Sequence, residues 1–129
     1  MADILFTVPG EPVPYLRMTQ GQVKLMRIAD CNISAKGMKV KERLRKYFTW
    51  KDWVYACSAK YPIEREPKTK VYMNVFCYFR NRTHGDPENI RKGIQDAIYK
   101  QDRYVAGAVD FLYDEKNPRC EIQIIQGGG

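Results

Sequence analysis

The feature that most constrains the fold is the run Val71-Tyr-Met-Asn-Val-Phe-Cys-Tyr-Phe79, in which aromatic and β-branched side chains predominate. Such side chains fit a pleated, half-buried surface, so we predict that this run is the main strand of the core. A polar loop that contains proline precedes it at residues 62–68. The chain is therefore expected to be built around a β-sheet.

Other segments complete a pattern of helices and strands around this run. We predict further strands at residues 4–8, 23–28, 105–113 and 120–125. Apolar residues at steps of three and four predict an amphipathic helix over residues 38–59, and a second helix is predicted from residue 87 to residue 100. The last two strands are separated by a short turn and are expected to pair as a hairpin. The predicted fold is α/β (α+β): one small domain over residues 1–126, a mixed or antiparallel sheet and two main helices, with a flexible tail at residues 127–129.

The charge balance raises the question of an acidic partner. The formal net charge is +7 and the pI is about 9.3, but many soluble proteins are basic for no specific reason. Basic residues are dense in the first part of the helix predicted over residues 38–59, where Lys41 and Arg45 are candidate DNA contacts. From this segment alone a solvated helix face is the favoured interpretation, and a face that contacts phosphates is the sharper alternative.

The cysteines and the apolar runs indicate a compartment. Cys31, Cys57, Cys77 and Cys120 form no CxxC pair, so reduced and mostly buried thiols are favoured over a zinc site or a disulfide framework. No apolar run approaches the ~20 residues that span a membrane, and the first residues lack the pattern of a secretory signal. We expect a cytoplasmic protein that has no membrane partner and no small-molecule cofactor.

Residues 80–98 form the most informative segment. Asp86 suits the N-cap of a helix, and the proline after it suits the first helical position. Glu88, Lys92 and Asp96 are spaced by four and share the polar side of this helix. A structural interpretation makes Asp86 only a cap and the stripe a set of ordinary ion pairs between residues four apart. The stripe alone favours that interpretation.

A catalytic interpretation gains from the surroundings of these acids. They lie where a strand passes into a helix, a further acid, Asp102, follows the helix, and the neighbourhood is basic. Three hard oxygen ligands suit Mg²⁺, with Mn²⁺ as a substitute, and such an ion can activate water against a phosphodiester. Lys92 is placed to stabilise charge that develops on the phosphate. Asp110 and Asp114 remain alternatives to Asp102 as the third acid.

The residues resemble a known family. Asp86-Pro-Glu88-Asn89-Ile-Arg-Lys92, continuing into Asp96-Ala-Ile, is similar to the acidic signature of RusA-type Holliday junction resolvases, Asp-x-Asp/Glu-Asn-x-x-Lys followed by Asp-Ala-Leu. The segment Tyr99-Lys-Gln-Asp102-Arg-Tyr-Val105 resembles the next element of that family, as the opening strand with its proline turn up to Arg17 and the closing strand also do. The likeness covers both ends and the second half of the chain, and is weakest over residues 18–67.

The resemblance implies a crossover junction endodeoxyribonuclease of the kind found in bacteria and phages. It implies a homodimer that uses Mg²⁺ to nick opposing strands of a four-way DNA junction during recombination and repair. Asp86, Glu88 and Asp102 become the catalytic metal ligands, and Lys92 assists them. Asn89 and Asp96 take supporting places beside the ligands, although Asp96 is also open to a purely structural role. The DNA contacts implied together with the basic helix are Arg17, Arg80, Arg82, Lys100, Arg103, Lys41 and Arg45.

Two questions stay open on the sequence. Gln101 stands where the family usually has an acid, so a DNA-binding module with a decayed acidic site is the alternative function. Trp50 and Trp53 fit either the core or a dimer interface, and the core is favoured.

Overall fold

The structure is a computed structural model that describes residues 3–16 and 19–126. Arg17 and the tail at residues 127–129 therefore lie outside the described residues. The elements in chain order are β1 (Ile4–Pro9), α1 (Gln20–Arg27), the 3-10 turn η1 (Asp30–Asn32), α2 (Ala35–Ser58), β2 (Val71–Phe79), α3 (Pro87–Ile98), β3 (Val105–Ala106), β4 (Val109–Tyr113) and β5 (Arg119–Gln126). The predicted α+β fold with a mixed sheet is confirmed, and a third, short helix is added to the two main ones.

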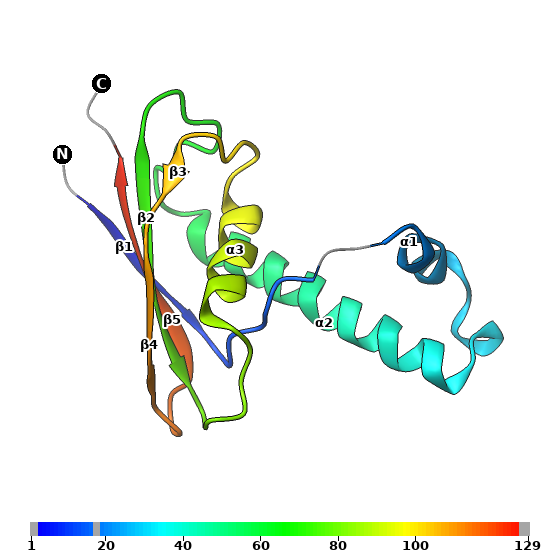
Figure 1. Cartoon of the computed structure of the whole chain (residues 1–129). Helices are drawn as coiled ribbons and strands as arrows, with labels where there is room; N and C mark the ends of the chain where they lie inside the picture. The colour runs from blue at the N-terminus through cyan, green and yellow to red at the C-terminus, as the bar shows by residue number, and fades with distance from the viewer. Residues whose placement is uncertain (1–2, 17–18, 127–129) are drawn as a thin grey trace.

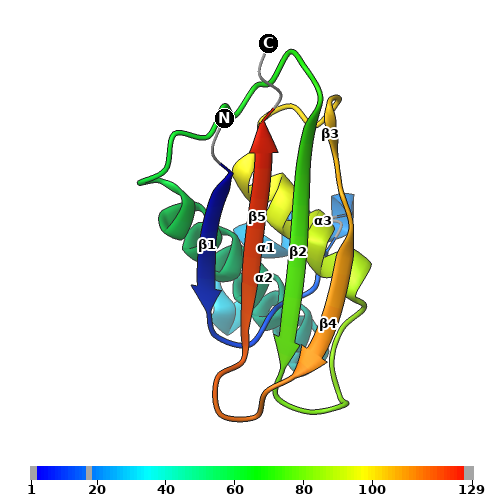
Figure 2. The same cartoon turned by 90° about the vertical axis from the view of Figure 1, so that its left-hand side faces the viewer.

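The five strands form one mixed sheet with helices on one side (Figures 1 and 2). β5 lies between β1 and β2 and is antiparallel to both. The other edge of β2 carries β3 and β4, both parallel to it. The run predicted as the main strand is thus central to the sheet, and its bounds are those predicted.

Alternation along the strands sorts their side chains between two faces. On β2 every second residue from Val71 to Phe79 is buried, and β1 shows the same alternation. α3 and the second half of α2 cover this inner face, where Tyr47, Ile94 and Met73 are fully buried. Within residues 3–16 and 19–126, the outer face carries no helix (Figure 2).

Two predicted strands differ from the structure. Residues 23–28 lie mainly in helix α1, which begins with a capping box: the Thr19 side chain accepts from Gln22 N, and the Gln22 side chain accepts from Thr19 N. The strand predicted over residues 105–113 is broken into β3 and β4. At the break, Gly107 has a φ of +144°, and a Cβ there would lie 2.1 Å from the Met73 carbonyl oxygen. Only glycine allows the backbone to approach β2 so closely.

The predicted hairpin of the last two strands is wrong. β4 and β5 lie on opposite sides of β2 and do not pair with each other. The segment between them crosses the end of β2, where Asp114 N donates to the Phe79 carbonyl. The Arg119 guanidinium lies 3.8 Å from the centre of the Tyr78 ring. These contacts place β2 between the two strands.

The first half of α2 extends beyond the sheet and carries α1 on one side (Figure 1). We refer to residues 19–46 as the arm. Within it Leu44 is buried, and Leu25 of α1 packs near Gly37 of α2. The second half of α2 packs on the body, where Trp50 is buried as favoured, whereas Trp53 is 45% exposed and donates to the Pro9 carbonyl.

The four cysteines are free thiols, and Cys77 and Cys120 are buried opposite each other in the β2–β5 pair. Cys57 is partly buried and Cys31 is exposed, so burial holds for the two strand cysteines only. Within residues 3–16 and 19–126, no helix is both long enough and apolar enough to cross a membrane.

Candidate acidic site at the start of helix α3

Asp86 begins α3 as predicted. It is the N-cap residue, and one of its carboxylate oxygens accepts from Glu88 N at 3.0 Å. Pro87 stands at the start of the helix, where its missing N–H costs nothing. Asp86 and Glu88 are both exposed, so their remaining oxygens face solvent at the positive end of the helix dipole.

The loop before Asp86 is held by packing. The His84 ring stacks on Phe79 with centroids 3.7 Å apart. Its Nδ1 lies 2.7 Å from the Gly85 carbonyl and its Nε2 lies 3.1 Å from the Tyr113 hydroxyl. A Cβ on residue 85 would lie 2.9 Å from Pro14, which explains why glycine stands here. The histidine thus fixes the turn that presents Asp86.

The polar stripe of α3 does not form ion pairs along the helix. Among the described residues, no salt bridge joins Lys92 to Glu88 or to Asp96. Instead Lys92 Nζ lies 4.9 Å from the centre of the Tyr15 ring, and Asp96 pairs with Lys51 Nζ of α2 at 2.6 Å. The structural interpretation offered for the stripe is therefore wrong in its pairs, and the Lys92 ammonium has no carboxylate partner there.

Tyr47 lies beneath these two contacts. Its ring meets Tyr15 edge-on with centroids 5.7 Å apart, and it also lies near Lys51. Burial raises the pKa of the Tyr47 hydroxyl, and the nearby Asp96 carboxylate raises it further. The hydroxyl therefore stays protonated, although it makes no hydrogen bond of standard geometry to any residue that the structure describes. The Tyr15 and Tyr47 rings and the Lys51–Asp96 ion pair thus hold the side of α3 that carries Lys92 and Asp96.

Arg91 connects the same helix to the sheet. Its Nε donates to the Met73 carbonyl and its Nη1 donates to Gln95. Burial lowers the pKa of this guanidinium, while the Glu88 carboxylate acts in the opposite direction. Arg91 thus links α3 to the backbone of β2.

The third acid is not beside the first two within one chain. Asp102 follows the C-terminal end of α3, whereas Asp86 stands at its N-terminus, and twelve residues of helix span about 18 Å. The strand register agrees, because Val105 pairs with Val71 at the start of β2 while Asp86 follows its end. In the described part of the chain, no three acidic, histidine or cysteine side chains are close enough to hold a metal.

The alternative third acids are also placed elsewhere. Asp110 is in register with Phe76 and therefore shares the uncovered face of the sheet, opposite to α3. Asp114 is paired with Arg119 at 2.9 Å, and this contact holds the pKa of its carboxyl below the usual value. Neither joins Asp86 and Glu88.

A comparison with protein-family models and with curated proteins finds no match for this chain. The chemistry of the site consequently rests on the residues themselves.

The candidate DNA contacts are spread over the molecule. Arg80 and Arg82 are exposed in the loop that leads to Asp86, and Lys100 and Arg103 are exposed near Asp102. The two on α2 belong to the arm, where Asp30 accepts Lys41 Nζ at 2.9 Å and Arg45 Nη2 at 2.8 Å. The Lys41 side chain is only 5% exposed, so its ammonium is committed inside the arm.

The Asn89 side chain is exposed, and its backbone carbonyl accepts from Tyr15 N at 3.1 Å. This bond places the Tyr15 ring beside Lys92. Sequence reasoning missed Tyr15, Tyr47 and Lys51. The only local signal was their position in a proline-rich segment and on the apolar side of a helix, and neither identifies the partner.

Proposed function

We propose that the chain is a Mg²⁺-dependent, structure-specific endodeoxyribonuclease that acts as a homodimer and nicks branched DNA such as a four-way junction. The proposal joins the RusA-type resemblance of the sequence to the arrangement at the start of α3. It also places the enzyme in a reducing cytoplasm, in keeping with its free thiols.

The observation that carries the proposal is the uncommitted charge at this end of the helix. Asp86 and Glu88 are exposed there with no cation paired to them among the described residues. Lys92, one turn further along, is held over Tyr15 while Lys51 pairs with Asp96. A purely structural stripe would pair these charges with one another, whereas a site for a metal and a phosphate needs them free.

The donor set of one chain fits Mg²⁺ in its usual mode, in which one or two carboxylates combine with waters and substrate phosphate. Asp86 and Glu88 would hold the ion, which when bound lowers the pKa of an attacking water and stabilises the leaving oxygen. Lys92 would bind a non-bridging phosphate oxygen and offset its growing charge. Tyr15 holds the lysine in position, and the turn fixed by His84 orients Asp86.

The homodimer gives Asp102 a place in the same site. Because the two ends of α3 are about 18 Å apart, Asp102 of one chain cannot join Asp86 of that chain without a large rearrangement. A twofold dimer with antiparallel α3 helices brings each Asp102 to the acids of the other chain. Two equivalent sites then act on the two strands of a symmetric junction.

The alternative is a DNA-binding module with a decayed acidic site. The separation of Asp102 from Asp86 within one chain favours it if the protein is a monomer. It leaves unexplained why, among the described residues, exposed Asp86, Glu88 and Lys92 stand close together on one helix without forming an ion pair.

Cleavage of a labelled four-way junction beside a linear duplex, both in Mg²⁺, tests the proposal. Wild type is expected to give paired nicks near the crossover of the junction and none in the duplex. Asp86→Asn and Asp102→Asn should each abolish cleavage, while Glu115→Gln, an exposed acid in the β4–β5 turn, serves as the matched control. Tight binding without cleavage in Mg²⁺ or Mn²⁺ refutes the enzyme and leaves the binding module.

Mixing the two inactive variants tests assembly of the site between chains. A heterodimer of Asp86→Asn with Asp102→Asn contains one intact site and one doubly altered site if the acids come from different chains. The mixture should then regain cleavage, as single nicks. If all acids act within one chain, no site is intact and the mixture stays inactive.

A further inference from the structure

Nearly all of the net charge lies on the arm. Residues 19–46 contain eight lysines and arginines but only two acids. The rest of the chain contains fourteen lysines and arginines and thirteen acids. Since the formal net charge is +7, the body is close to neutral and the arm is strongly basic. A basic potential concentrated on one part of the surface can attract an acidic macromolecule.

The basic residues of α2 divide into two sets. Lys41 and Arg45 face α1 and η1, and both pair with Asp30. These charges hold α1, η1 and α2 together, since the same Lys41 ammonium also donates to the Ile28 carbonyl. The Arg45 guanidinium contributes most, and the Lys41 ammonium next, to lowering the pKa of Asp30 to about 2. These two residues were the candidate DNA contacts on this helix; the Lys41 side chain is buried within the arm, whereas the Arg45 side chain remains 46% exposed beside Asp30.

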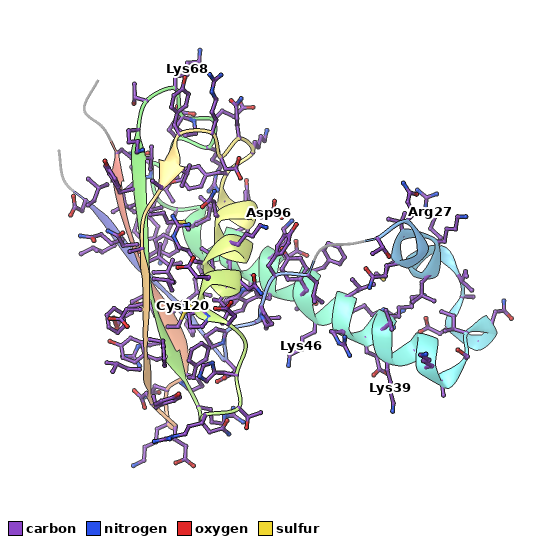
Figure 3. All side chains as sticks on the ribbon, viewed as in Figure 1. Arg27, Lys39, Lys46, Lys68, Asp96 and Cys120 are labelled. Carbon is purple, nitrogen blue, oxygen red and sulfur yellow. The ribbon has the colours of Figure 1, made fainter. Side chains whose placement is uncertain are left out.

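The other set is an exposed stripe on a different side of α2. It consists of Lys36, Lys39, Arg43 and Lys46. At 100° per residue the four positions fall within about 80° of arc, so they form one row. Figure 3 shows Lys39 and Lys46 pointing to the same side of α2, away from α1. Among the described residues, none of the four takes part in a salt bridge.

We propose that this stripe is a second DNA-contacting surface, which holds the phosphate backbone of a duplex arm at a distance from the acidic site. The inference deepens the proposed function and rests on it for the identity of the substrate. The stripe rises about 15 Å from Lys36 to Lys46, and one strand of B-DNA carries a phosphate every ~3.4 Å along the axis, so four cations can face up to about four phosphates. Such contacts position a branched substrate without reading its sequence.

The test measures binding of a fluorescein-labelled four-way junction by anisotropy, in EDTA to prevent cleavage, from 50 to 300 mM KCl as rough limits. The stripe variant is Lys39→Gln with Arg43→Gln and Lys46→Gln. The matched control removes three exposed cations of the body, Lys60→Gln with Lys68→Gln and Lys70→Gln. Both lose the same charge and keep helix-compatible or loop-compatible side chains.

We expect the slope of log affinity against log salt to fall by about 2 to 3 in the stripe variant, at ~0.9 per lost phosphate contact. Affinity near 0.1 M salt should fall on the order of a hundredfold, while the control changes less than about threefold. At saturating protein, the stripe variant should cleave as fast as wild type, because the row does not touch the acids.

Equal slopes for the stripe variant and the control overturn the inference. If the stripe variant instead elutes as a monomer with an unchanged slope, the row is an interface with a second copy. The two proposals fail separately: wild type that binds through the stripe but never cleaves refutes the enzyme and keeps the surface. Wild type that cleaves while the stripe variant binds like the control keeps the enzyme and refutes the surface.

Discussion

Replacing Gly107 with alanine tests the break between β3 and β4. The residue has a φ of +144°, which costs an alanine about 1–3 kcal/mol. The added Cβ would lie 2.1 Å from the Met73 carbonyl oxygen, so the segment must also move away from β2. That movement strains two neighbouring hydrogen bonds: Val75 N to the Ala108 carbonyl at 3.0 Å, and Arg91 Nε to the Met73 carbonyl at 3.1 Å. At about 1 kcal/mol for each, the total loss is about 3–5 kcal/mol.

Urea denaturation followed by circular dichroism measures this loss, and a thermal melt should shift down by on the order of 10 °C. Gly21→Ala is the matched control, because a Cβ there meets only Thr19 Oγ1 at 3.9 Å, and alanine favours the helix by up to ~1 kcal/mol. If the free energy of unfolding of Gly107→Ala is within about 1 kcal/mol of the wild-type value, residue 107 does not approach β2 as closely as the structure shows. The placement of β4 against β2 is then refuted.

Two more predictions concern ion pairs. Lys51→Met should change the free energy of unfolding by less than about 1 kcal/mol, yet lower Mg²⁺-dependent junction cleavage about tenfold, because Asp96 can then pair with Lys92 one turn away. Lys51→Arg should restore cleavage, and a loss that arginine does not rescue would make the pair merely structural. Acidification should loosen the arm, since the folded-state pKa of Asp30, held at about 2 chiefly by Arg45, lies below its ordinary value of 3.8. This contribution is present above pH ~4 and is lost as pH falls through ~2. Thermal melts from pH 5 to 2 should show the loss in wild type beyond that in Asp30→Asn, and parallel curves would contradict the role of Asp30.

The elements that periodicity predicted well are those whose own residues set their environment. β2 carries enough aromatic and β-branched side chains to fill both sides of a central strand, so its bounds were predicted correctly. α3 has a cap, a proline at its first turn and one apolar face, and all three act locally. It ends at Ile98 rather than near residue 100, and the Ile98 carbonyl at this end accepts from Arg65 of a distant loop.

Errors arose where another part of the chain decides the structure. Val23 and Leu25 alternate with polar residues as a strand would, but residues 20–27 form a helix that packs against α2. The capping box at Thr19 and Gln22 was the local signal for it. The predicted hairpin was wrong for a similar reason. Two strands joined by a short turn usually pair with each other, but β4 and β5 each pair with β2 instead.

The candidate site likewise has a part that the sequence predicted and a part that it did not. Spacing along one helix was enough to predict that Glu88, Lys92 and Asp96 share an exposed side. It could not predict which of these charges are neutralised, because the deciding residues, Tyr15 and Lys51, come from segments far away in the sequence. Helix periodicity predicts which side of a helix a side chain lies on, but not which residues it contacts there.

The position of Asp102 therefore decides more about function than its presence in the sequence. An acid beyond the far end of a helix about 18 Å long cannot share one metal with the acids at its start in a single chain. If the acid is catalytic, the active site includes two chains, and cleavage must depend on protein concentration below the dissociation constant of the dimer. If cleavage is independent of dimerisation, Asp86 and Glu88 suffice with phosphate and water, and Asp102 lies with Lys100 and Arg103 as part of a DNA-facing surface. The dilution series thus distinguishes a shared site from a two-carboxylate site without any substitution.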